Sequence, residues 1–170
     1  MKYRNEEDKC NGLAGMLIAL MLLDEFENII EIDIDDDNNE YIHFTPKFFA
    51  WQSQLVPPKQ AWEIALRNFQ LTTAMMMANL ICRYSKSKKA IYSDVRKAIF
   101  KTVAEEGKRA CQLEEDEVNS IFMRTFDYVN DRMQNKRVLA LAKSISAEIS
   151  KRRFMGDDEL KDLFASLQNQ

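Results

Sequence analysis

An acidic run at residues 33–40 is the part of this sequence whose residue types most resemble a reactive or ligand-binding site. Its carboxylate and amide oxygens are the ligands that Ca²⁺ and Mg²⁺ prefer, and alternate positions copy the ligand spacing of an EF-hand loop. The match then fails, because Asn38 replaces the glycine needed for the sharp turn and Phe44 stands where a bidentate glutamate belongs. We therefore favour an acidic, solvent-facing hairpin that discourages edge-to-edge pairing of strands. A weak Ca²⁺ or Mg²⁺ site is the alternative, and no other cofactor is expected. Its candidate ligands are Asp33, Asp35, Asp37 and His43.

A basic segment, residues 83–109, is the second candidate site. It holds nine Lys and Arg residues against three acidic ones. Such a segment could contact nucleic-acid phosphates or an acidic protein surface, although most charge runs are ordinary solvated helix faces. The candidate partner-binding residues are Arg83, Lys86, Lys88, Lys89, Arg96, Lys97 and Lys101.

The common catalytic motifs are missing from this sequence. Its four glycines are scattered, so they cannot form a phosphate-binding loop, and it has no Cys-x-x-Cys pair. A catalytic triad would depend on the single histidine, His43, and no serine or cysteine stands out as its nucleophile. We lean against an enzyme, although dispersed carboxylates could still form an active site that only a fold would show.

Charge is distributed unevenly along the chain. Residues 1–40 carry a net charge of −9 and residues 41–170 a net charge of +6. The two parts could attract each other within the fold, which we favour, or present a surface of one sign to a partner. The leading hypothesis is a non-enzymatic intracellular helical interaction protein: an adaptor, a regulator, or an inhibitor or immunity-type protein that binds a protein partner or a second copy of itself. Nucleic-acid binding through residues 83–109 and a metal-dependent role of residues 33–40 are the alternatives.

Composition indicates one compact α-helical domain, residues 1–170. The chain is 46% hydrophobic and 30% charged, with only 4 glycines and 3 prolines, which suits a helix-rich globular protein. Its three cysteines follow no disulfide or zinc pattern, so a reducing compartment and a cytoplasmic location are expected. The apolar run at residues 13–23 is too short to span a bilayer, so no membrane association is predicted.

The segment 57–84 is predicted to be the central helix of a bundle of about six to seven helices. Pro57 and Pro58 suit a first helical turn, and apolar residues then recur along two rows. The first row is Trp62, Leu66, Phe69, Thr73, Met76 and Leu80, and the second is Leu71, Met75, Ala78 and Cys82. Two apolar rows cover more than half of a helix, so both should be buried.

Other helices are predicted at about residues 6–27, 46–55, 89–109, 114–133, 138–154 and 157–167. In the first of these, Gly12 and Gly15 indicate close approach of another helix. A short β-hairpin is predicted at residues 29–44, because Ile30, Ile32 and Ile34 alternate with acidic residues. Its three isoleucines are expected to share the inner face.

Overall fold

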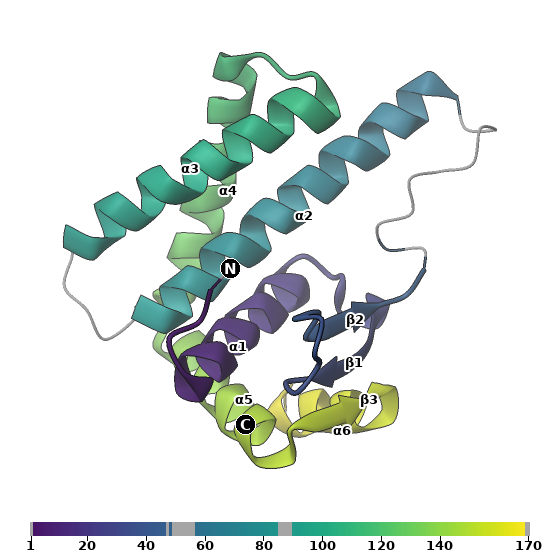
Figure 1. Cartoon of the computed structure of the whole chain (residues 1–170), viewed down its shortest axis with the longest axis vertical. Coiled ribbons are helices and arrows are strands. Elements are labelled where there is room, and N and C mark those ends of the chain that lie inside the picture. Colours follow the sequence, from purple (N-terminus) through teal and green to yellow (C-terminus); the bar gives the residue numbers. More distant parts are fainter. Residues whose placement is uncertain (1, 47, 49–56, 85–89, 169–170) are drawn as a thin grey trace.

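The computed structural model describes residues 2–46, 48, 57–84 and 90–168, which form six α-helices and a small antiparallel sheet (Figure 1). This architecture confirms the predicted mainly α-helical fold with one hairpin. The helices are α1 (Glu6–Leu22), α2 (Pro58–Tyr84), α3 (Ala90–Cys111), α4 (Glu115–Met133), α5 (Lys136–Arg152) and α6 (Asp157–Gln168), and a 3₁₀ turn spans Phe26–Asn28. The strands are β1 (Ile29–Asp33), β2 (Ile42–Phe44) and β3 (Phe154–Gly156). The helix predicted at residues 46–55 lies almost wholly outside the described residues.

Helix α2 is the centre of the bundle, as predicted. It packs against α1, α3 and α4 (Figure 1). All four residues of its second apolar row are buried. The first row is buried only in part: Phe69 and Thr73 are inside, Met76 and Leu80 are half-buried, and Trp62 is 48% exposed. Burial of Trp62 was therefore a wrong prediction, because this side chain lines an open groove between the first turns of α2 and the start of α4.

The predicted close approach at the glycines of α1 is confirmed. A Cβ atom added at Gly15 would lie 2.3 Å from the carbonyl oxygen of Ala78 in α2. One added at Gly12 would instead meet side chains, with Asn79 Nδ2 at 2.7 Å. Glycine therefore allows the backbones of α1 and α2 to touch, and this contact forms the middle of the core.

The predicted hairpin is present, but its faces differ from the simple alternation. Strands β1 and β2 pair Ile29 with Phe44 and Ile32 with Ile42, with an irregularity between Ile29 and Glu31. Such a bulge shifts the phase of the strand by one residue. Ile29, Ile32 and Ile34 are consequently buried, whereas Ile30 is 40% exposed, so the predicted inward position of Ile30 was wrong.

A third strand, β3, was not predicted. It pairs antiparallel with β1 and makes the strand order β2-β1-β3. The sequence pattern predicts that the helix continues to about residue 154 and that Gly156 breaks the chain before the last helix. Helix α5 instead ends at Arg152, and its C-cap residue Arg153 has a φ of 64° that reverses the chain. The Arg153 carbonyl accepts a hydrogen bond of 3.0 Å from the amide of Ile34.

The last helices form as their local signals indicate. Glu114 and Glu117 make a capping box at the start of α4, and Val118, Phe122, Val129 and Met133 form its buried stripe. Asn135 caps α5 by accepting from the amide of Arg137. Helix α6 then covers β1 and β3 with its buried Leu160, Leu163 and Phe164.

Asn68 of α2 is 6% exposed, and neither its amide nitrogen nor its carbonyl oxygen has a hydrogen-bond partner. A buried unpaired polar group lowers stability by about 1–3 kcal/mol. The Asn68→Leu variant is therefore expected to have a free energy of unfolding about 1–2 kcal/mol higher than the wild type, measured by urea denaturation.

Asn79→Leu is the matched control on the same helix. Asn79 is fully buried but donates to Tyr3 at 3.0 Å, so its replacement should lower stability. Destabilisation by both substitutions would contradict this interpretation.

Candidate functional site

A groove of about 1060 Å³ lies between the hairpin and the packed helices α1 and α2. Its apolar surface comes from Leu13 and Met16 of α1, Met76 of α2, and Ile42 and Phe44 of β2. Met16, Met76 and Phe44 are only half-buried, so they remain accessible from solvent. The described lining residues are Tyr3, Leu13, Met16, Ile30, Glu31, Asn39, Glu40, Tyr41, Ile42, His43, Phe44, Met76, Asn79 and Thr102. We call this feature the hairpin groove.

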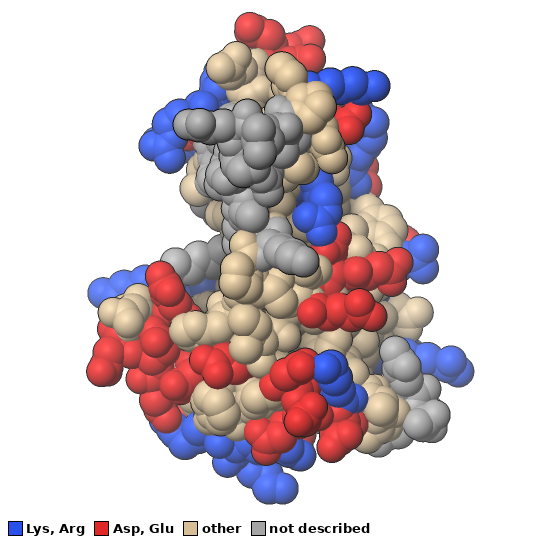
Figure 2. All heavy atoms as spheres, turned by 90° about the vertical axis from the view of Figure 1, so that its right-hand side faces the viewer, with Lys and Arg blue, Asp and Glu red and all other residues tan. Residues whose placement is uncertain are grey.

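The rim of the hairpin groove is acidic. Glu31 and Glu40 line it, and no lysine or arginine does so among the described lining residues. Figure 2, which looks toward the hairpin side of the molecule, shows Asp and Glu gathered over its lower half, where the sheet lies. Neither glutamate has a lysine or arginine ion partner in the described part of the chain; His43 Nδ1 is 4.0 Å from Glu31 Oε1. The groove thus combines an apolar floor with unneutralised negative charge.

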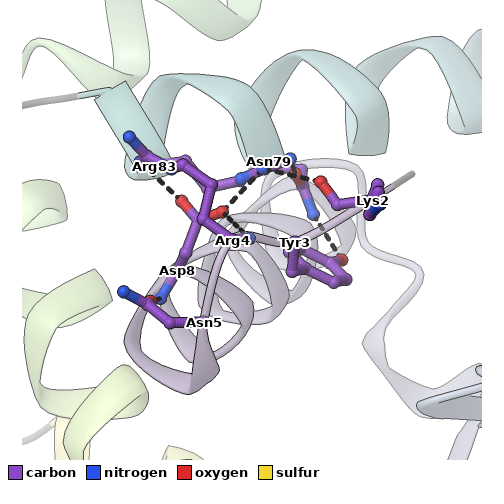
Figure 3. A network of polar contacts seen from close by, with 7 residues as sticks. All are labelled: Lys2, Tyr3, Arg4, Asn5, Asp8, Asn79 and Arg83. Carbon is purple, nitrogen blue, oxygen red and sulfur yellow. Dashed lines mark hydrogen bonds and ion pairs between the residues drawn. The ribbon is translucent and has the colours of Figure 1, made fainter.

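The N-terminal segment forms one wall of the hairpin groove and is held by a polar network (Figure 3). The guanidinium of Arg83, at the end of α2, donates to Asp8 Oδ2 at 2.7 Å and to the Lys2 carbonyl at 3.0 Å. Arg4 donates to Asp8 Oδ1 at 2.8 Å, and Asn79 donates to the Tyr3 hydroxyl at 3.0 Å. The network therefore positions Tyr3 against the groove.

Asp8 and Arg83 form a buried ion pair, with side chains that are 3% and 5% exposed. Burial by itself raises the pKa of Asp8, but hydrogen bonds from Arg83 and Arg4 outweigh it and hold this pKa well below its usual range. Asp8 is consequently ionised at any physiological pH. Because the carboxylate is saturated by these donors, we assign it a structural role.

The predicted metal ligands are engaged elsewhere. Asp33 Oδ1 accepts from the amide of Asp35 within the turn, and Asp35 accepts from Arg153 Nε at 2.8 Å. The hydrogen bond from Arg153 lowers the pKa of Asp35. His43 lies 3.9 Å from Asp36 and faces the groove. Asp37 is exposed. Within the described ranges, no three His, Cys, Asp or Glu side chains are grouped so that they could hold a metal ion, so the geometry lends the metal hypothesis no support.

The predicted basic site is only partly on the surface. Arg83 is buried in the ion pair with Asp8, so its assignment to a partner-binding surface was wrong. Arg96 is half-buried, with its guanidinium over the ring of Phe126 at 5.1 Å. Lys97 and Lys101 are exposed on α3. The remaining candidates, Lys86, Lys88 and Lys89, lie outside the described residues.

A second cavity of about 950 Å³ lies where α1 and α5 meet the end of α2. It is lined by Cys10 and Cys82, by Ser146 and Ser150, and by the Asp8–Arg83 pair. Burial raises the pKa of Cys82 to about 12 and also raises the pKa of Cys10. A thiol with a raised pKa stays protonated at neutral pH and is a poor nucleophile, so this cavity offers no activated cysteine.

Sequence reasoning missed the hairpin groove, although it had identified several elements that form it. The acidic segment supplies Glu31 and Glu40 to the rim, but the apolar floor comes in part from α1 and α2, which are distant from it in sequence. Compared with known proteins, the chain matches no family model, no curated protein and no solved structure. In the part of the chain that the structure describes, no helix has the length and apolarity that a membrane span needs.

Proposed function

We propose that this protein is a non-enzymatic interaction protein that binds a protein partner through the hairpin groove. One observation carries the proposal: an accessible apolar floor lies beside an acidic rim. Protein-binding surfaces typically have this arrangement, with an apolar centre surrounded by polar residues. Roles as an adaptor, a regulator or an inhibitor are all compatible with it.

Ile30 strengthens the proposal. The bulge in β1 turns this isoleucine outward, where it is 40% exposed and lines the groove. An apolar side chain at such a position gains stability only when another surface covers it. The other exposed basic residues of α3, Lys97, Lys101 and Arg109, are a smaller feature, since Lys108 on the same helix is paired with Glu115 at 3.0 Å. We therefore rank nucleic-acid binding below protein binding.

Site-specific crosslinking tests this proposal. Replacing Ile30 with the photo-crosslinking residue benzoylphenylalanine, in the host that produces the protein, is expected to give a discrete covalent adduct with another protein. The matched control carries the same residue at Phe154, which is 48% exposed on β3, the edge strand that flanks β1 on the side away from β2. The adduct should form at position 30 and be absent or much weaker at position 154.

The second arm of the experiment ties the adduct to the groove. Adding Met76→Lys to the Ile30 variant places a charge on the apolar floor and should abolish the adduct, with circular dichroism confirming that the variant still folds. Equal crosslinking at positions 30 and 154, or none at position 30, would contradict the proposal.

A further inference from the structure

We propose that the segment recognised by the hairpin groove is a cationic amphipathic stretch of the partner protein, with apolar side chains on one face and lysine or arginine beside them. This inference rests on the proposed function and specifies the chemistry of the partner. Two features of the described lining residues support it: the apolar floor and the negative charge of the rim.

The floor of the groove suits several apolar side chains rather than one fixed shape. Met16 and Met76 contribute flexible thioethers, and methionine adapts to irregular apolar surfaces. Ile30 and Phe44 extend the apolar surface along the hairpin. A volume of about 1060 Å³ lies just above the roughly 300–1,000 Å³ typical of small-molecule sites. A row of side chains from a peptide segment would fill it.

The rim determines the sign of the partner's charge. Glu31 and Glu40 point to a cationic partner, because a basic residue between them would neutralise charge that the described residues leave without a lysine or arginine. Neighbouring carboxylates at Asp33, Asp36 and Asp37 add to the negative potential of the hairpin. An acidic segment or a nucleic acid would be repelled at the same place.

Tyrosine rings at the end of the groove already associate with cations of this chain. The Lys9 ammonium lies 4.4 Å from the centroid of the Tyr41 ring, and the Arg83 guanidinium lies 4.8 Å from that of Tyr3. Both tyrosines line the hairpin groove. Because each ring already holds a cation of this chain, the two tyrosines mark the end of the acidic part of the groove, and the preference for a cationic partner rests on Glu31 and Glu40.

Three synthetic peptides of equal length test the inference on the full chain by fluorescence anisotropy. One has leucines at helical spacing with lysines beside them, the second replaces every lysine with glutamate, and the third keeps the lysines but replaces the leucines with serine. Only the first is expected to bind well, with at least tenfold higher affinity than either of the others. Its affinity should fall as salt is raised, because charge attraction is screened.

Variants of the rim locate the effect. The pair Glu31→Gln and Glu40→Gln should weaken binding of the first peptide about three- to tenfold, mainly through slower association. The matched control, Asp127→Asn with Asp131→Asn at exposed positions of α4, removes the same number of carboxylates away from the groove and should leave affinity unchanged. Equal losses in both pairs would show a non-specific charge effect and overturn the inference.

The outcomes separate this inference from the proposed function. The inference is wrong if the crosslink at position 30 forms but the first peptide does not bind, or if the acidic peptide binds as well as the first. The groove would then be a docking site for a partner segment that is not cationic and amphipathic. If a labelled duplex DNA, added without the peptide, binds the protein and the Met76→Glu variant weakens that binding, cationic selectivity is likewise contradicted. Absence of the crosslink would overturn both proposals.

Discussion

The Arg83→Met variant is expected to lose about 3–5 kcal/mol of stability, measured by urea denaturation. Methionine keeps much of the volume of the side chain but leaves the Asp8 carboxylate, which is 3% exposed, with only the largely exposed Arg4 as its charged partner. The lost hydrogen bond to the Lys2 carbonyl also frees the N-terminal wall of the hairpin groove. Peptide affinity should therefore fall together with stability.

The double variant Asp8→Leu with Arg83→Met is the control for this loss. It removes the stranded charge, so it should regain much of the stability, since apolar residues replace buried ion pairs at little cost. If the double variant is as unstable as Arg83→Met alone, the loss comes from packing and our account of the ion pair is wrong.

Acid titration provides an independent measure of the same pair. The pKa of Asp8 is lower in the folded than in the unfolded protein, so its contribution to stability is present above about pH 4 and is lost as the pH falls below that value. The Asp8→Asn variant lacks this contribution and should lose less stability than the wild type over the acidic range.

The Gly15→Ala variant is the second prediction with a large effect, a net destabilisation of about 3 kcal/mol. Alanine favours a helix over glycine by about 1 kcal/mol, but here its Cβ would lie 2.3 Å from the Ala78 carbonyl oxygen. Ordinary contacts begin near 3.4 Å, so α1 and α2 would have to separate by about 1 Å in a densely packed core. Thermal and urea denaturation measure the loss.

Two other glycines supply graded controls for Gly15→Ala. Gly12→Ala should cost less stability, because its nearest neighbours are the movable side chains of Asn79 and Tyr3. Gly156→Ala should be nearly neutral, since its nearest neighbour is an atom of Phe154 at 4.0 Å. Equal effects at all three positions would show that helix contact is not the cause.

Local signals in the sequence were sufficient for most elements of the fold. The start of α2 follows from Pro57 and Pro58, and the start of α4 from its glutamates, because caps and proline act within one helical turn. The hairpin follows from the alternation of isoleucines with acidic residues. The prediction of the close helix contact at Gly15 was also correct, because glycine in a buried helix has few other reasons to be there.

Features that depend on distant segments were not predictable. Strand β3 forms because β1 offers it an edge, and three residues between two helices carry no strand signal of their own. The exposure of Trp62 depends on how the first turns of α2 lie against α4, and the burial of Arg83 depends on Asp8 lying opposite it. Each involves a partner far along the chain.

The sequence by itself determined the helical class, the hairpin and the concentration of negative charge near the N-terminus, because periodicity, capping and composition are properties of neighbouring residues. Only the tertiary structure decided which charges are free: it buried Arg83 against Asp8, paired Arg153 with Asp35, and left Glu31 and Glu40 beside an apolar floor built from α1, α2 and β2. The physical reason is that neutralisation and burial depend on distances in space, which periodicity along the chain does not specify.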